Sequence, residues 1–228
     1  MIAVDIDSTL YDFATPARQA FLDLALRHGE KEEYFRGGYQ SWVEWRSPAD
    51  VCGPEAFNEV LDIVHSPEII RAQTPYPNSI EVLREVACEH ELFFISNRSS
   101  KSVAPTEEWL WDIYDYPEGE LICTMEDKQP YLSECQYLID DRAKTLVQFV
   151  EDFHWKYTYG SISTPDSDTS DERKAFGLLF EYNRNLTDIP NIYLAPTWSG
   201  IAYYLRRAGV ITDNGKAMSR EVSGIEIS

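Results

Sequence analysis

The chain begins with a short apolar run that leads into carboxylates. Residues 1–4 are Met, Ile, Ala and Val, and Asp5 and Asp7 follow them. A run this short predicts a buried strand, because a helix needs a longer periodic pattern. Similar apolar runs recur later in the chain and predict further strands over 92–95, 121–123, 137–139, 175–180 and 192–194.

Helical patterns lie between these runs. Apolar residues with helical spacing predict helices over 80–87, from about residue 105, around 146–150 and over 199–207. Strands that alternate with helices indicate a parallel sheet that is covered on both faces. The predicted fold class is α/β, with a Rossmann-like parallel sheet flanked by helices.

The segment between the first strand and residue 78 has a different pattern. Apolar residues recur with helical spacing over 17–25 and 57–64, and Gly37-Gly38 and Ser47-Pro48 interrupt the pattern. This predicts a small helical insertion after the first strand. We therefore expect a core of residues 1–13 and 78–210, a helical cap of residues 14–77 and a polar C-terminal tail of residues 211–228.

Charge narrows the choice of partners. The 228 residues include 20 Lys and Arg against 39 Asp and Glu, a formal net charge of −19. This negative field disfavours a long nucleic acid and an anionic membrane surface, but it permits a small phosphorylated ligand. The sequence contains no apolar run long enough to span a membrane, so no membrane partner is expected.

Cysteine usage and the N-terminus indicate the compartment. The four cysteines (Cys52, Cys88, Cys123 and Cys135) form no Cys-x-x-Cys pair, and no histidine follows them at zinc-site spacing. We expect reduced thiols and, because no secretory leader precedes the first strand, a cytoplasmic protein. The sequence is compatible with a monomer or a homodimer.

Polar residues end several of the predicted strands. The first ends in Asp5 and Asp7, the second in Ser96-Asn97 and a later one in Asp140-Asp141, with Lys128 shortly before it. Ligands of open parallel sheets bind at the carboxyl ends of the strands. Crowded carboxylates need a cation, and Mg²⁺ suits oxygen ligands beside a substrate phosphate. The pattern therefore indicates phosphoryl transfer.

These residues also resemble a known family. Asp5-Ile6-Asp7-Ser8-Thr9-Leu10 is similar to the first motif of the haloacid dehalogenase-like phosphatases. The second, third and fourth motifs are matched, in order, by residues 93–97, by Lys128 and by residues 138–142. A narrower resemblance is to the 5′(3′)-deoxyribonucleotidases, and it rests on Asp12-Phe13, residues 75–78, 126–128 and 182–183, and Trp198.

The resemblance implies a role for each motif. Asp5 would attack phosphorus and form an aspartyl-phosphate, while Asp7 would act as general acid and base. Mg²⁺ would be held by Asp5, the backbone carbonyl of Asp7 and either Asp140 or Asp141. The alternative is that these carboxylates have only a structural role, in turns and as helix caps.

The phosphate and substrate contacts are inferred in the same way. Ser96, Asn97 and Lys128 would bind the phosphate, although a loop serine and a solvated lysine are the alternatives. Phe13 and Trp42 are candidates to stack on a base, with a small apolar cap core as the alternative. Arg98 is a candidate substrate contact, and a solvated surface residue is the alternative.

The predicted function is Mg²⁺-dependent hydrolysis of a phosphomonoester, with a (deoxy)nucleoside monophosphate as the substrate. The sequence departs from the family pattern at two places. Ser8 replaces a usual glycine but leaves both carboxylates in place, whereas Ser96-Asn97-Arg98 replaces Thr-Ser-Pro and leaves the phosphate contacts and the substrate open. Residues 98–110 also resemble the phosphatase domains of polynucleotide kinase-phosphatases, which suggests a 3′-phosphatase for nucleic-acid ends. A non-catalytic module that binds a phosphorylated ligand is the third alternative.

Overall fold

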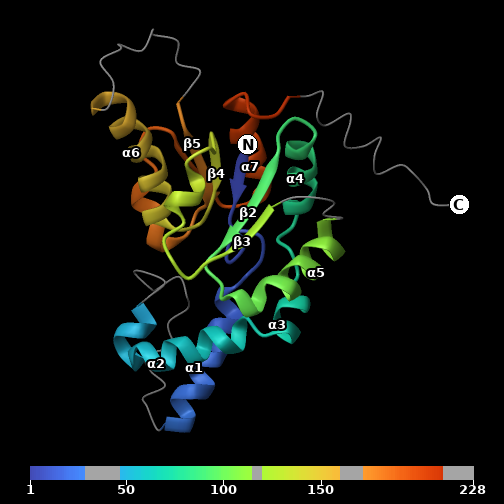
Figure 1. Cartoon of the computed structure of the whole chain (residues 1–228), viewed down its shortest axis with the longest axis vertical. Coiled ribbons are helices and arrows are strands. Elements are labelled where there is room, and N and C mark those ends of the chain that lie inside the picture. The colour runs from blue at the N-terminus through green and yellow to red at the C-terminus, as the bar shows by residue number, and fades with distance from the viewer. Residues whose placement is uncertain (29–46, 115–119, 160–171, 213–228) are drawn as a thin grey trace, which may run out of the picture.

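A computed structural model describes residues 1–28, 47–114, 120–159 and 172–212 of the chain (Figure 1). These residues form one parallel sheet of six strands in the order β3-β2-β1-β4-β5-β6. The strands are β1 (Ile2–Val4), β2 (Leu92–Ser96), β3 (Glu120–Cys123), β4 (Tyr137–Ile139), β5 (Lys174–Leu178) and β6 (Ile192–Ala195). The α/β fold class predicted from the sequence is confirmed.

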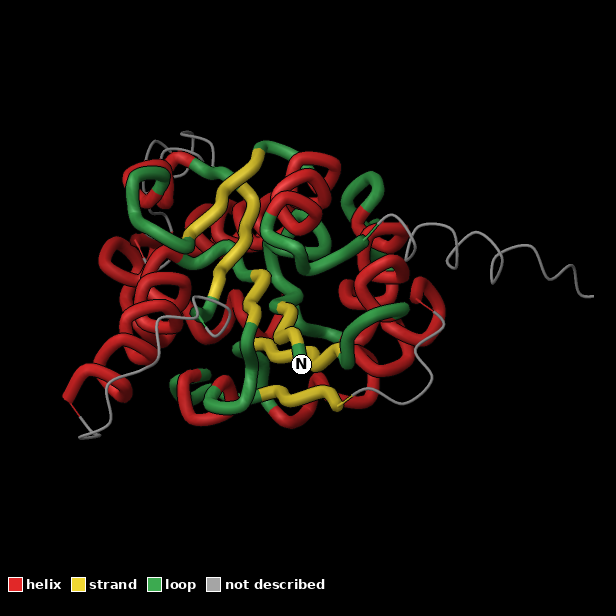
Figure 2. The backbone as a smooth tube through the Cα atoms, turned by 90° about the horizontal axis from the view of Figure 1, so that it is seen from above, coloured by secondary structure: helices red, strands yellow, loops and turns green. Residues whose placement is uncertain are grey.

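Helices connect the strands and lie on both sides of the sheet (Figure 2). They are α1 (Ala14–His28), α2 (Ser47–Val64), α3 (Pro67–Arg71), α4 (Ser79–Ala87), α5 (Val103–Tyr114), α6 (Ala143–Tyr159) and α7 (Trp198–Arg207). Short 3-10 helices are η3 (Ser100–Ser102), η4 (Gln129–Leu132) and η6 (Glu181–Leu186). None of the described helices is long and apolar enough to cross a membrane.

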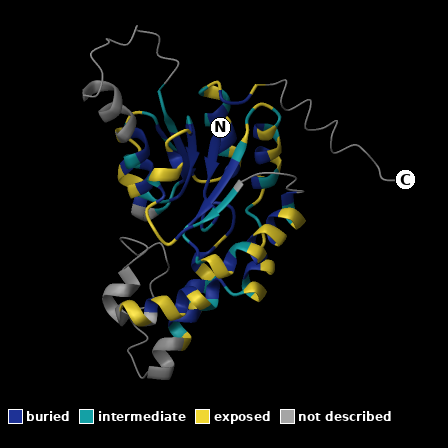
Figure 3. Cartoon of the chain, viewed as in Figure 1, coloured by how far each residue is buried: buried dark blue, intermediate teal, exposed yellow. Residues whose placement is uncertain are grey.

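The side chains of each strand point alternately to the two faces of the sheet and form two buried layers. In β1, Ile2 and Val4 belong to the layer that contains α4, α5 and α7, whereas Ala3 belongs to the layer that contains α6. Successive strand residues point to opposite faces, so a strand with both faces covered is apolar at every position. Figure 3 shows the result, with buried strands between helices that expose their outer sides.

The helices α1, α2 and α3 stand beyond the carboxyl ends of the strands (Figure 1). The rings of Phe21 in α1 and Phe57 in α2 stack with their centroids 6.0 Å apart. Both rings belong to the same apolar cluster as β1, so the three helices are packed onto the sheet layer. The candidate base-stacking residue Trp42 and the tail beyond residue 212 lie outside the described residues.

The ends of β1 and β5 differ most from the sequence prediction. β1 ends at Val4, so Asp5 and Asp7 follow the strand and are not part of it. β5 ends at Leu178, two residues earlier than predicted. There the amide of Asn183 donates to the carbonyl of Leu178 at 2.9 Å, and its oxygen accepts from the backbone N–H of Phe180 at 2.8 Å. These bonds turn the chain into η6 and end the strand.

Candidate active site

The candidate site lies at the carboxyl ends of β1, β2 and β4. Val4 pairs with Phe94 in β2 and with Ile139 in β4. The residues that follow these three strands therefore lie side by side at the same edge of the sheet. The chain runs from β1 outward to β2 and β3 and then returns to the other side of β1 with β4. Such a switch point is where open α/β sheets bind ligands.

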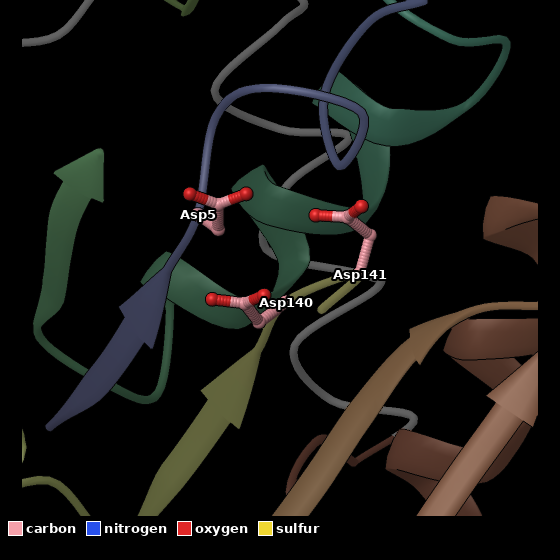
Figure 4. A group of neighbouring side chains, drawn as sticks. All are labelled: Asp5, Asp140 and Asp141. Atoms are coloured by element: carbon pink, nitrogen blue, oxygen red, sulfur yellow. The ribbon is translucent and has the colours of Figure 1, made fainter. Parts of the chain in front are cut away.

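Three carboxylates meet at this point. Asp5, Asp140 and Asp141 are all buried, and ligand oxygens from the three lie within 4.8 Å of one another. Figure 4 shows the three carboxylates around one common space. Burial raises the pKa of Asp5 to about 6; the Asp140 charge adds to this shift and Lys128 opposes it. Buried carboxylate oxygens of this kind suit a hard divalent cation such as Mg²⁺.

Lys128 supplies the positive charge beside this cluster. Its Nζ donates to Oδ1 of Asp5 and, at 3.1 Å, to Oδ2 of Asp140. Burial by itself would lower the pKa of Lys128, but the two carboxylates raise it above its usual value. The ammonium therefore stays charged, next to the predicted nucleophile.

Asp7 is held by a second buried cation. The Nε of Arg98 donates to Oδ2 of Asp7 at 3.0 Å, and Nη2 donates to Oδ1 at 2.7 Å. The hydroxyl of Tyr11 also donates to Oδ1, and that of Ser96 donates to Oδ2 at 2.7 Å. Burial alone would raise the pKa of Asp7, but Arg98, assisted by His65, holds it well below its usual range. Asp7 is an ionised carboxylate with four donors on its two oxygens.

A tight turn after β1 brings Asp7 to this position. Ser8 has a φ of 61°, in the left-handed region that glycine adopts most easily. The haloacid dehalogenase-like phosphatases usually have glycine at this position, because glycine adopts a positive φ without a steric penalty. After the turn, Tyr11 makes isolated bridges with Asp7 and Pro75. Its ring packs edge-on against Trp109, with the centroids 5.5 Å apart.

The structure places the predicted phosphate contacts as follows. Ser96 points its hydroxyl to Asp7. The amide of Asn97 donates to the carbonyls of Thr124 and Glu126 at 3.1 and 3.0 Å, so its N–H groups serve the neighbouring loop. Lys128 lines the pocket together with Asp5, as the resemblance implies.

The two described substrate candidates have different surroundings. Phe13 is buried and lines the pocket. Arg98 is fully buried and does not line it, so the structure shows neither the substrate contact nor the solvated surface residue that the sequence suggested. Its guanidinium is directed to Asp7, Tyr11 and, at 2.6 Å, the hydroxyl of Thr106 in α5.

Three residues of the site were not assigned from the sequence: Tyr11, His65 and Arg142. Arg142 is the last residue of the fourth motif, donates to Asn97 Oδ1 at 2.7 Å and lines the pocket. His65 follows α2, and nothing in the sequence pattern singles it out. An aromatic residue four positions after Asp7 gives at most a weak signal for Tyr11.

Neither a protein-family model nor a curated protein sequence matches the chain. Solved structures match its fold. A predicted phosphoglycolate phosphatase from Haemophilus somnus has a TM-score of 0.59 and 14% sequence identity, covering 91% of this chain and 96% of that chain. A haloacid dehalogenase-like family hydrolase from Streptococcus pneumoniae has a TM-score of 0.58 and 15% identity, covering 89% and 97%.

A third solved structure is a HAD family hydrolase from Deinococcus radiodurans with bound phosphate and sodium. Its TM-score is 0.55 at 13% identity, covering 92% of this chain and 96% of that chain. All three likenesses extend over nearly the full length of both chains. The described chain thus has a haloacid dehalogenase-like fold.

Proposed function

We propose that the protein is a Mg²⁺-dependent phosphomonoester hydrolase of the haloacid dehalogenase-like family. One observation carries the proposal: the Asp5 carboxylate lies at the switch point of the sheet, in contact with the buried Lys128 and within 4.8 Å of Asp140 and Asp141. A nucleophile, a phosphate-neutralising ammonium and a metal-binding cluster are what phosphoryl transfer to a carboxylate requires. The solved structure with bound phosphate has the same fold.

The donor set fits a magnesium ion. Crowding and burial raise the pKa of Asp5 to about 6, and a bound cation would relieve the repulsion among the carboxylates. The two oxygens of Asp140 accept from Lys128 and from the backbone N–H of Arg142. Asp141 lines the pocket with Asp5, so these two are the proposed side-chain ligands. When bound, the ion supplies charge neutralisation for the phosphoryl oxygens.

The proposed reaction has two half-reactions. In the first, an oxygen of Asp5 attacks phosphorus while Lys128 pairs with the phosphoryl oxygens, and Asp7 gives a proton to the leaving oxygen. In the second, water attacks the aspartyl-phosphate and Asp7 takes its proton. The ionised state of Asp7 suits the second step. For the first step Asp7 must carry a proton, which the monoanionic form of the phosphate ester can supply.

We further propose a (deoxy)nucleoside monophosphate as the substrate. Phe13 supports this choice, because its ring lines the pocket and aromatic rings can contact a base. The motifs shared with the 5′(3′)-deoxyribonucleotidases support it as well. The net charge of −19 favours a small substrate over a nucleic-acid strand.

The test is release of inorganic phosphate from 5′ and 3′ nucleoside and deoxynucleoside monophosphates, with Mg²⁺ and with EDTA. A 3′-phosphorylated oligonucleotide and p-nitrophenyl phosphate complete the panel. We expect turnover of monophosphates in the presence of Mg²⁺ and no turnover in the presence of EDTA. Activity on the oligonucleotide alone would replace the nucleotidase proposal with end processing, and no activity on any ester would overturn the hydrolase proposal.

A further inference from the structure

His65 occupies a fixed position at the end of α2. Its backbone N–H donates to the carbonyl of Leu61 at 2.9 Å, and its carbonyl accepts from the Ser102 hydroxyl at 3.2 Å. The ring lies against that of Phe13, with the centroids 5.4 Å apart. Only 8% of the residue is exposed. The imidazole is therefore held in one place by groups on both sides of the site.

The Nε2 atom of this imidazole has no hydrogen-bond partner among the described residues. Oδ2 of Asp7 lies 3.5 Å from it, which is longer than a typical N–H to oxygen hydrogen bond. That oxygen already accepts from Ser96 and Arg98. A buried ring nitrogen without a partner destabilises the fold, and a ligand atom that fills the position removes this cost.

His65 also lines two cavities. One is the pocket that contains Asp5 and Lys128. The other has a volume of about 540 Å³, within the usual range for small-ligand sites. Polar side chains of Asp62 and Lys101 line it together with Leu61. A molecule whose phosphate sits beside Asp5 and whose remainder occupies the second cavity has to pass the imidazole.

We propose that His65 contacts the leaving group of the substrate, with Nε2–H donating a hydrogen bond to the leaving oxygen. This rests on the proposed phosphomonoesterase function and extends it to the substrate class. The second cavity would hold the alcohol portion, and its mixed charged and apolar lining suits a hydroxylated alcohol such as a nucleoside. Asp7 already has four donors, and among the described residues His65 Nε2 is the buried side-chain nitrogen without a hydrogen-bond partner.

The contact acts in the first half-reaction. As the bond from Asp5 to phosphorus forms, the bond from phosphorus to the leaving oxygen breaks, and its electron pair moves to that oxygen. The hydrogen bond from His65 stabilises this charge. The alcohol receives its proton from Asp7, which regains one from the attacking water of the second half-reaction. His65 keeps its own proton throughout.

The test compares leaving groups of different quality. An alkyl alkoxide needs stabilisation as it departs, whereas p-nitrophenolate leaves with little help. We expect His65→Phe to lower kcat about 100-fold on deoxyuridine 5′-monophosphate or glycerol 2-phosphate and by less than about fivefold on p-nitrophenyl phosphate. His65→Gln retains an N–H donor and should restore part of the loss on the alkyl esters.

His90→Phe is the matched control, since His90 contacts the carbonyl of Val210 at the other end of the sheet. It should leave the ratio of the two rates unchanged. Equal losses on both kinds of ester in His65→Phe, no loss on either, or a larger loss on the nitrophenyl ester than on the alkyl esters would overturn the inference. A wild-type protein that hydrolyses none of these esters would overturn the proposed function instead, so the two failures are distinguishable.

Discussion

The ion pair between the buried Arg98 and the partly buried Asp7 allows a quantitative test. Arg98 has no exposed surface, and its guanidinium makes two hydrogen bonds to Asp7, one to the Tyr11 hydroxyl and one to that of Thr106. Replacing Arg98 with Met preserves much of the volume but leaves the Asp7 carboxylate, whose side chain is 17% exposed, without its counter-ion. Breaking a buried pair in this way costs about 3–5 kcal/mol.

Urea unfolding at pH 7 of the wild type, Arg98→Met, Asp7→Asn and the double variant measures this pair. At about 2–4 °C per kcal/mol, the single arginine variant should also melt about 6–20 °C below the wild type. The two substitutions should be non-additive by about 2 kcal/mol, because the groups are in direct contact. A loss below about 1 kcal/mol for Arg98→Met, or additive losses, would refute the view that the pair holds the site together.

The pH dependence of the same variants supplies an independent check. The folded pKa of Asp7 lies well below its usual value, so the ionised carboxylate contributes stability at pH above the unfolded pKa. This contribution disappears as the pH falls through the folded pKa. The stability difference between wild type and Arg98→Met should therefore be largest near neutral pH and shrink below about pH 4. A difference that is constant with pH would indicate lost packing only.

Three further predictions concern the metal cluster and its support. Asp5→Asn should reduce turnover to less than about 1% of wild type while thermal melting shows an intact fold, because the nucleophile is lost. Asp141→Asn should raise the Mg²⁺ concentration for half-maximal activity at least about tenfold, whereas the exposed control Asp188→Asn should not change it. Gly177→Ala should destabilise the protein by about 1–3 kcal/mol in urea unfolding, since its Cβ would meet the Asp140 carbonyl oxygen. A wild-type midpoint for that variant would show that the strands can separate freely there.

Local pattern was sufficient for the sheet and for the main elements of the site. The short apolar runs predicted six buried strands because a strand covered on both faces must be apolar throughout. Asp5, Lys128 and Asp140 could be placed together because parallel strands bring their carboxyl ends to one edge. These inferences depend only on residue type and on the order of strands along the chain.

The surroundings of Asp7 were decided by tertiary structure. Arg98 lies two residues after the end of β2, and its sequence context suits an exposed residue as well as a buried one. Its burial depends on α5, whose Thr106 binds the guanidinium, and on the turn at Ser8 that directs Asp7 toward it. No pattern in the sequence states which carboxylate a distant guanidinium will reach, because that depends on how helices pack.

The position of His65, in the helical segment, could not be predicted from the sequence either. It follows a helix that the periodicity predicted, but its distance to Asp7 is set by the packing of α2 onto the core. The sequence by itself determined the strands and the acidic cluster, since both follow from local alternation and chain order. Only the tertiary structure decided the partners of Asp7 and the place of His65, since these contacts join segments separated by many residues.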